Sequence, residues 1–228
     1  SESRDGCAGD AGELDPVFSA DRRTLFYASD RCQRTVFRLW SLKLNESGRP
    51  EGKPVLLSTE RAIQPSATAR TIAATALDDR GLPEGFLLIS LESGKSQRIV
   101  YRNGGMALRP ILAQDEKELL FLAIDEDTNG DGRLDLNDRG AVHRMSLKSG
   151  SVRHVTDSTM PVYNIALSPY LGGGILYAGY DNDAGRSRIF LSRPDGLIPR
   201  KKNALHQYEF AQTFSGDRRQ LALESVIQ

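Results

Sequence analysis

Phe18-Ser-Ala-Asp-Arg-Arg-Thr-Leu25, close to the start of the chain, returns close to its end as Phe214-Ser-Gly-Asp-Arg-Arg-Gln-Leu221, with six identical residues in eight. Equivalent positions lie between these two copies at 67–68, 112–113 and 167–168, so that the steps measure 45 to 55 residues. A regular period of this size is the sequence signature of a repeat architecture. We therefore expect one supersecondary unit that is used several times.

A second marker keeps the same period. Four similar segments carry a serine in register, and a glycine follows each serine after a few residues. These serines are Ser41, Ser90, Ser146 and Ser192. Short runs rich in β-branched and aromatic residues surround the markers and are separated by turn residues, which predicts four short antiparallel strands in each unit. A four-stranded unit of this length is typical of a propeller blade.

The predicted fold is therefore all-β, a β-propeller of four-stranded antiparallel blades, with four complete blades and half of a fifth visible. The expected blade bounds are about 15–60, 61–106, 107–160, 161–207 and, for the partial blade, 208–228. Residues 1–14 are small, polar and glycine-rich, and we expect them to form an N-terminal tail. Helical periodicity is nearly absent, which argues against a bundle or a parallel α/β fold. The half-blade favours a continuation or a partner beyond Gln228.

The stretch that is most informative about function is Asp127-Thr-Asn-Gly-Asp-Gly-Arg-Leu-Asp-Leu-Asn-Asp138, which lies inside the longest repeat step. It places oxygen-bearing side chains at positions 1, 3, 5, 9 and 12 of a loop, with a glycine at position 6. Ca²⁺ binds six to eight oxygens, and this spacing resembles the calcium loop of an EF-hand, in which position 7 contributes a backbone carbonyl. The predicted calcium ligands are Asp127, Asn129, Asp131, the carbonyl of Arg133, Asp135 and Asp138.

Two features distinguish this loop from an EF-hand. Position 12 is Asp138 instead of the longer glutamate, which predicts a weaker or water-assisted closure of the site. The flanking segments 118–124 and 141–147 have the pattern of strands, so no helix pair is expected to open on binding. A polar turn rich in Asp, Asn and Gly is the competing interpretation. Asp125 and Glu126 add negative charge beside the loop and are candidates for an extra ligand.

The overall composition narrows the classes of partner. Thirty basic and thirty acidic side chains cancel, so there is no electrostatic case for binding nucleic acid or an anionic membrane surface. The longest apolar run is too short to span a bilayer, and no signal peptide is visible. Cys7 and Cys32 are compatible with one disulfide or with two thiols. A calcium loop suited to millimolar extracellular calcium favours a periplasmic or extracellular location.

Asp15-Pro-Val-Phe-Ser-Ala-Asp21 and Leu25-Phe-Tyr-Ala-Ser-Asp-Arg31 resemble the TolB-like propeller repeat. Its blades open with an Asp-Pro-x-Phe-Ser-Pro-Asp-Gly turn and continue into a Phe-x-Ser-Asp-Arg strand. Partial copies occur at 167–169 and 214–217, whereas the second and third units depart from the pattern after their proline. The resemblance implies an exported bacterial propeller, commonly of about six blades, that serves as a docking surface. Similar repeats also form the gating propeller in front of some serine peptidases.

Catalytic motifs are not found in the sequence. The three histidines, His143, His154 and His206, match neither the His-Glu-x-x-His metal motif nor a catalytic triad, and we expect them to be packing or surface residues. There is no Gly-x-Ser-x-Gly motif, and Gly172-Gly-Gly174 lacks the Lys and Ser/Thr of a phosphate-binding loop.

Two hypotheses about function follow. The leading hypothesis is a non-catalytic, calcium-binding propeller that acts as a protein–protein interaction scaffold in the bacterial cell envelope or the extracellular space, as part of a larger complex. The alternative is the propeller domain of a larger hydrolase or peptidase, which gates or regulates a catalytic domain outside this chain. Fold-level analogy does not decide between them.

Overall fold

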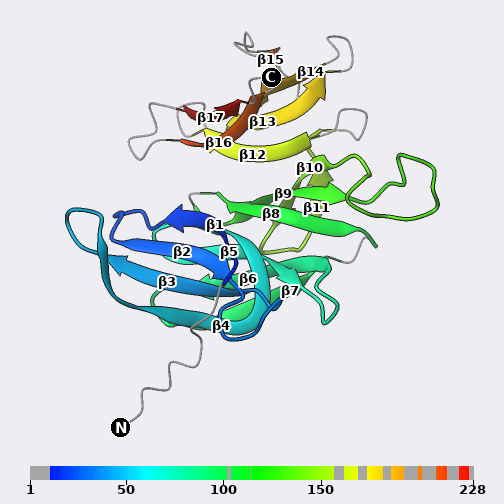
Figure 1. The fold of residues 1–228 in the computed structure, drawn as a ribbon. Helices are drawn as coiled ribbons and strands as arrows, with labels where there is room; N and C mark the ends of the chain where they lie inside the picture. Colours follow the sequence, from blue (N-terminus) through cyan, green and yellow to red (C-terminus); the bar gives the residue numbers. More distant parts are fainter. Residues whose placement is uncertain are drawn as a thin grey trace. The chain divides into compact units, whose positions relative to one another are not determined.

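The structure is a computed structural model. It describes residues 11–101, 104–113, 115–156, 162–168, 174–181, 186–192, 200–201, 209–214 and 221–225. In these parts of the chain every regular element is a strand, and the strands pair antiparallel with their neighbours (Figure 1). The prediction of an all-β fold with antiparallel sheets is therefore confirmed. None of the described segments is a helix long and apolar enough to cross a membrane.

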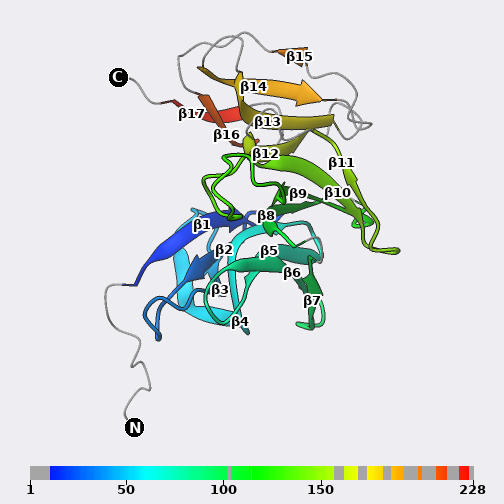
Figure 2. The ribbon, with the colours of Figure 1, turned by 90° about the vertical axis from the view of Figure 1, so that its right-hand side faces the viewer.

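The chain divides into two compact units, Ser1–Arg102 and Asn103–Gln228. In the first unit, the described strands form one seven-stranded sheet whose order follows the sequence. These strands are β1 (Glu13–Phe18), β2 (Thr24–Ser29), β3 (Arg38–Leu44), β4 (Pro50–Ala67), β5 (Thr71–Leu77), β6 (Pro83–Ser90) and β7 (Ser96–Val100). The run of neighbouring strands can be followed from blue to green in Figure 2.

The 18-residue strand β4 belongs to two four-stranded meanders. Its first part pairs with β3, up to Arg61 opposite Arg38, and its last part pairs with β5, from Ala62 opposite Ala76. The sequence pattern predicts a separate short strand near 54–58, and the structure has one continuous strand instead. No glycine or proline interrupts residues 55–64, so the strand can continue from its pairing with β3 into its pairing with β5.

A proline bulge recurs in three strands that open a four-stranded segment. Pro16, Pro65 and Pro110 each lie where the register shifts. The preceding residues have positive φ, at 48° for Asp15, 54° for Gln64 and 49° for Arg109. Proline has no N–H for the ladder, and a bulge is one of the places where a strand tolerates that loss. The repeat is therefore visible in the backbone as well as in the sequence.

Apolar side chains from both meanders fill the core of the first unit. The cluster consists of Phe26, Ala28, Leu39, Ala62, Ile72, Ala74, Ala76, Leu87 and Ile89. The alternating residues of β5 in this cluster are fully buried, and two of the three are alanines. Small side chains at these positions allow the facing strands to approach closely.

The second unit holds two four-stranded sheets and one described pair of strands. The first sheet has the order β11-β10-β9-β8 and consists of β8 (Met106–Leu112), β9 (Glu118–Ile124), β10 (Ala141–Ser146) and β11 (Val152–His154). The second sheet consists of β12 (Val162–Ser168), β13 (Gly174–Asp181), β14 (Arg186–Ser192) and β15 (Arg200–Lys201). The separate pair consists of β16 (Glu209–Phe214) and β17 (Leu221–Ser225). None of the sheets in the described residues closes on itself, and the number and bounds of the blades stay predictions.

The core of the second unit joins its two four-stranded sheets. The cluster consists of Leu108, Leu120, Leu122, Ile124, Val142, Val155, Ile175, Tyr177 and Phe190. The rings of Tyr177 and Phe190 stack at 5.3 Å between centroids, with an interplanar angle of 16°. Strand β9 therefore has one face in this core, which fixes the end of the strand from which the candidate calcium loop departs.

The N-terminal region is described from residue 11, and β1 begins at Glu13. The backbone N–H of Gly12 donates to Asp30 Oδ1 at 2.7 Å, which holds the start of β1 beside the turn after β2. Cys7 lies outside the described residues. The disulfide with Cys32 therefore stays a prediction.

Candidate metal sites

The predicted calcium loop lies in the connection 125–140 between β9 and β10 (Figure 1). Both strands are almost completely buried, and Ala141 lies opposite Ala123 in the register. The loop therefore begins and ends on two adjacent, well-packed strands. The expectation of strands on both sides of the loop is confirmed, and the loop has no EF-hand helices.

Asp127 organises the first half of the loop. Its Oδ1 accepts hydrogen bonds from the N–H groups of Gly130 at 2.7 Å and Asp131 at 3.2 Å, and its Oδ2 accepts one from Gly132 at 2.8 Å. The two glycines have φ of 77° and 78°, a conformation that costs glycine little and other residues more. Asn129 Oδ1 accepts a hydrogen bond from Asp131 N–H at 2.9 Å. The backbone therefore coils around the Asp127 carboxylate.

Asp138 closes the loop from the other end. Its side chain is buried, and its Oδ1 accepts hydrogen bonds from the N–H groups of Thr128 at 2.8 Å and Asn129 at 3.3 Å. Its Oδ2 accepts a hydrogen bond from the N–H of Asp135 at 3.0 Å. The hydrogen bond from Asp135, followed by those from Thr128 and Asn129, lowers the pKa of Asp138 below its usual value and favours the carboxylate. A shorter acid at position 12 is thus held by the backbone of the loop.

The structure brings the predicted ligands into two hydrogen-bonded groups. Asp127, Asn129 and Asp131 form the first, and Arg133 joins it by donating its N–H to Asp131 Oδ1 at 2.9 Å. Asp135 and Asp138 form the second. The oxygen donors are of the type that Ca²⁺ prefers, but in the described loop no three of the carboxylates lie within 4.8 Å of one another. Ligation itself stays a prediction.

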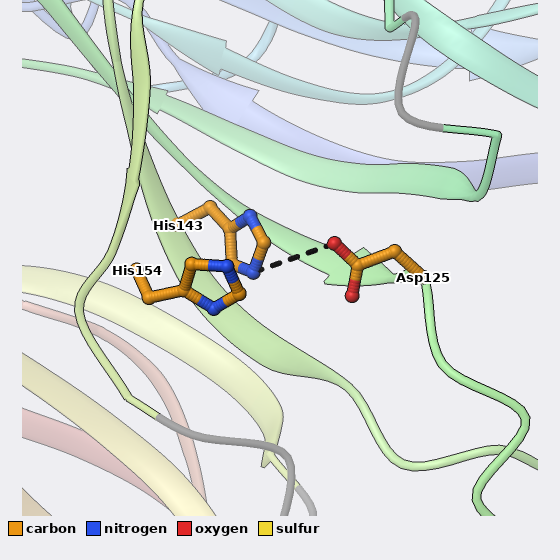
Figure 3. A group of neighbouring side chains, drawn as sticks. All are labelled: Asp125, His143 and His154. Carbon is orange, nitrogen blue, oxygen red and sulfur yellow. Dashed lines mark ion pairs between the residues drawn. The ribbon is translucent and has the colours of Figure 1, made fainter.

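A different set of side chains converges where the loop leaves β9. Asp125, His143 and His154 each place one ligand-type atom within 4.8 Å of the others, and in the described residues this is the one such group of His, Cys, Asp or Glu (Figure 3). His143 in β10 lies directly opposite His154 in β11. The two rings are 4.1 Å apart between centroids, with an interplanar angle of 50°. His143 Nε2 faces Asp125 Oδ2 at 3.8 Å.

The surroundings of His143 lower the pKa of its imidazole and favour the neutral form. Its side chain is fully buried and packs against Phe121, with 5.6 Å between ring centroids. Burial lowers the pKa of His143, the negative charge of Asp125 opposes this effect, and His154 lowers the pKa further. A neutral imidazole keeps a ring nitrogen available as an acceptor.

The burial of His143 and the exposure of His154 agree with the expectation of packing or surface residues, but this expectation does not include their contact with each other. His143 is buried and His154 is exposed, but the two are neighbours across a hairpin. The sequence contains a signal for this hairpin, because the marker residue Ser146 and the glycine that follows it, Gly150, predict a tight turn between two strands. Counting outward from this turn places 143 opposite 154. His206 lies outside the described residues.

No protein-family model and no curated protein sequence matches this chain. Solved structures of β-propeller proteins do match its fold. TolB from Acinetobacter baumannii is 16% identical with a TM-score of 0.59, and the match covers 90% of this chain and 46% of TolB. A chain of a nidogen/laminin complex is 11% identical with a TM-score of 0.61, over 90% of this chain and 69% of that chain.

An enzyme is among the similar structures. A puromycin-hydrolyzing peptidase from Mycobacterium tuberculosis is 14% identical with a TM-score of 0.61, and the match covers 89% of this chain and 33% of the peptidase. At these identities the similarity shows the fold alone, a TolB-like propeller fold. This chain spans about half the length of TolB and a third of the peptidase, so any activity, substrate or partner is a matter for proposal.

Proposed function

We propose that this chain is a non-catalytic, calcium-binding β-propeller that acts as a protein–protein interaction scaffold in the bacterial cell envelope or the extracellular space. The observation that carries the proposal is the loop 127–138, which combines the ligand spacing of a calcium loop with a backbone coiled around Asp127. The propeller fold shared with TolB and with the chain of the nidogen/laminin complex supports the scaffold role.

Electrostatics gives the loop a reason to bind a cation. Twelve residues carry four carboxylates, at Asp127, Asp131, Asp135 and Asp138. The backbone hydrogen bonds described above orient these groups but leave their negative charge in place. A bound Ca²⁺ would neutralise that charge and replace mutual repulsion by attraction to one centre.

The same loop is suited to contact a partner. The connection 125–140 is long for a compact β-domain, and long connections without secondary structure are usually functional. Leu134 and Leu136 are 38% and 71% exposed. Calcium would order this segment in advance, so that less conformational entropy is lost when its apolar side chains dock on another protein.

Thermal unfolding with Ca²⁺ and with chelator tests the calcium site. We expect Ca²⁺ to raise the melting temperature, because a ligand that binds the folded state alone stabilises it by about 2.7 kcal/mol when its free concentration is about 100 times its Kd. Asp127→Ala and Asp131→Ala should abolish the rise. Asp115→Ala, which removes an exposed acid from the turn before β9, should leave it intact. No shift at millimolar Ca²⁺ would reject the calcium site.

The similarity to the peptidase supports a second candidate, the propeller domain of a larger hydrolase or peptidase. In that case the chain would gate or regulate a catalytic domain carried elsewhere on the same protein. The sequence of the full natural protein distinguishes the two candidates. A neighbouring domain with a Gly-x-Ser-x-Gly motif would favour the hydrolase, and further blades would favour the scaffold.

A further inference from the structure

We infer that Asp125, His143 and His154 form a second metal site, which takes a divalent transition metal such as Zn²⁺ and not Ca²⁺. The inference goes beyond the proposed calcium function, because it concerns residues outside the loop 127–138 and another donor chemistry. It starts from three ligand-type atoms that already lie within 4.8 Å of one another on two strands and the adjoining loop end (Figure 3).

The backbone holds the two histidines in place. His143 and His154 are direct partners in the β10–β11 register, with Arg144 opposite Arg153 as the next pair. Directly opposite residues on an antiparallel pair project to the same face of the sheet with neighbouring Cβ atoms. The two imidazoles are therefore brought together by the sheet itself and need no loop movement to meet.

Asp125 completes the set from the end of β9. It is the first residue after Ile124, whose side chain is buried in the core of the unit. Its carboxylate is largely buried, with 15% of the side chain exposed, and one oxygen lies 3.8 Å from His143 Nε2. Two ligands of a tetrahedral metal with bonds of about 2.0–2.1 Å are about 3.4 Å apart. The observed separation is close to this value.

The donor atoms select the metal. Imidazole nitrogen suits Zn²⁺, Fe²⁺, Ni²⁺ and Cu²⁺, whereas Ca²⁺ takes oxygen ligands alone. Two histidines and one carboxylate are a frequent ligand set for such metals, and three protein ligands leave at least one coordination position for water. His154 is exposed, which opens the site to solvent and lets its ring adjust to a metal at small cost.

The competing explanation is a pair of packed histidines beside an aspartate, with no metal. Both explanations account for the ring contact and for the 3.8 Å separation from Asp125. They differ in one respect. A metal needs ligands from all three side chains, so its affinity would fall with Asp125→Asn or with His154→Ala, and a packing role gives no metal affinity to lose.

Metal titration of the chain without a histidine tag tests the inference. After chelator treatment and in excess Ca²⁺, Co²⁺ should give visible d–d absorption bands at one ion per chain, and Zn²⁺ should displace them. His154→Ala and Asp125→Asn should each weaken Zn²⁺ binding by about 100-fold or more, since loss of an outer-shell partner alone costs about 10–100-fold. His154 is exposed and Asp125→Asn is nearly isosteric, so both variants are expected to fold.

Matched controls separate this site from other sources of binding. Glu126→Gln removes the neighbouring negative charge, Arg153→Ala changes the neighbouring exposed residue of β11, and His206→Ala removes the remaining histidine. Each should leave Zn²⁺ affinity within about tenfold of the parent, below the change expected for a lost ligand. Failure of Zn²⁺ to bind, or equal binding by the parent, His154→Ala and Asp125→Asn, would overturn the inference.

The outcome is independent of the calcium proposal. Asp127→Ala with Asp131→Ala should remove the Ca²⁺-dependent rise in melting temperature and preserve the Co²⁺ bands, and His154→Ala should do the reverse. If Ca²⁺ does not raise the melting temperature, whereas Zn²⁺ binds the parent chain and does not bind His154→Ala, the calcium function fails and the second site stands. If Co²⁺ and Zn²⁺ signals disappear with Asp127→Ala and Asp131→Ala while His154→Ala keeps them, the second site fails.

Discussion

Equivalent positions in two consecutive four-stranded segments of the chain, β4–β7 and β8–β11, carry side chains of different chemistry. Arg98 on β7 lies opposite Leu87 on β6, and His154 on β11 lies opposite His143 on β10. In both cases the residue is on the fourth strand of its segment, and the connection between the second and third strands ends nearby. That connection is short in the first unit, residues 78–82, and long in the second, residues 125–140.

Arg98 and its partners Glu60 and Glu84 form the first corner, to which Arg98 supplies a permanent positive charge. The second corner consists of Asp125, His143 and His154. The guanidinium of Arg98 donates to Glu84 Oε1 at 2.6 Å, to Glu60 Oε2 at 2.9 Å and to the carbonyl of Leu77 at 2.7 Å. The corner around His154 has imidazoles and the carboxylate of Asp125 instead, with four further carboxylates in the adjoining loop. The two carboxylates of the first corner are paired with a cation of the chain itself, whereas the second corner has donor atoms for cations from solution. We therefore expect the stability of the first unit to be independent of metal and that of the second to depend on it.

The largest effect is expected from Leu87→Ala, which removes the buried residue opposite Arg98. Leu87 is fully buried in the core cluster of the first unit, and buried Leu→Ala changes cost about 2–5 kcal/mol. Denaturant unfolding in Ca²⁺ and in chelator should give the same loss of stability. A loss that differs between the two conditions would break the comparison.

A smaller effect is expected from Arg98→Met, which leaves Glu60 and Glu84 without their shared cation. The three side chains are 29–36% exposed, so we expect a loss of about 2 kcal/mol, below the cost of breaking a fully buried pair. Arg80→Met is the matched control, because Arg80 is 79% exposed beside Asp78 and such pairs contribute about 0–1 kcal/mol. Equal losses for the two variants, measured by denaturant unfolding, would show that the Arg98 corner is not special.

Two glycine substitutions compare the connections directly. Gly81 and Gly132 have φ of 84° and 78°, and a Cβ at either position meets no atom within 4 Å. Alanine should therefore cost about 1–2 kcal/mol at both, from backbone conformation alone. Ca²⁺ titrations should then separate them, with the melting-temperature rise reduced in Gly132→Ala and unchanged in Gly81→Ala. Identical titrations would argue against calcium in the long connection.

The smallest effect is expected from Leu136→Ser. Leu136 is 71% exposed, and exposed substitutions of this kind change stability by about 0.5 kcal/mol or less. Leu82→Ser, at a 49% exposed residue of the short connection, is the matched control. If Leu136→Ser destabilises the chain by much more than Leu82→Ser in denaturant unfolding, the leucine packs within the folded loop and is not available to a partner.

The sequence predicts the fold better than it predicts the sites. The repeat of short strands and turns identifies an all-β antiparallel fold, because alternation and turn residues act locally. It does not reveal that β4 is continuous, since pairing with β3 and β5 is a long-range effect that overrides the expected break. The candidate calcium loop is visible because its predicted ligands are close in sequence. Asp125, His143 and His154 are brought together by strand register, which a search for linear motifs does not see.

Strand β4 also has a consequence for how the first unit opens. The first part of β4 pairs with β3, and its last part pairs with β5. Because both meanders share β4, fraying of one meander also exposes the edge strand of the other. Unfolding of one meander therefore costs free energy in both meanders. We expect the amide hydrogens of Ala62 and Ile63 to exchange only when the whole first unit unfolds. The outermost amides of β7, which pair on one side with β6, should exchange through local fluctuations.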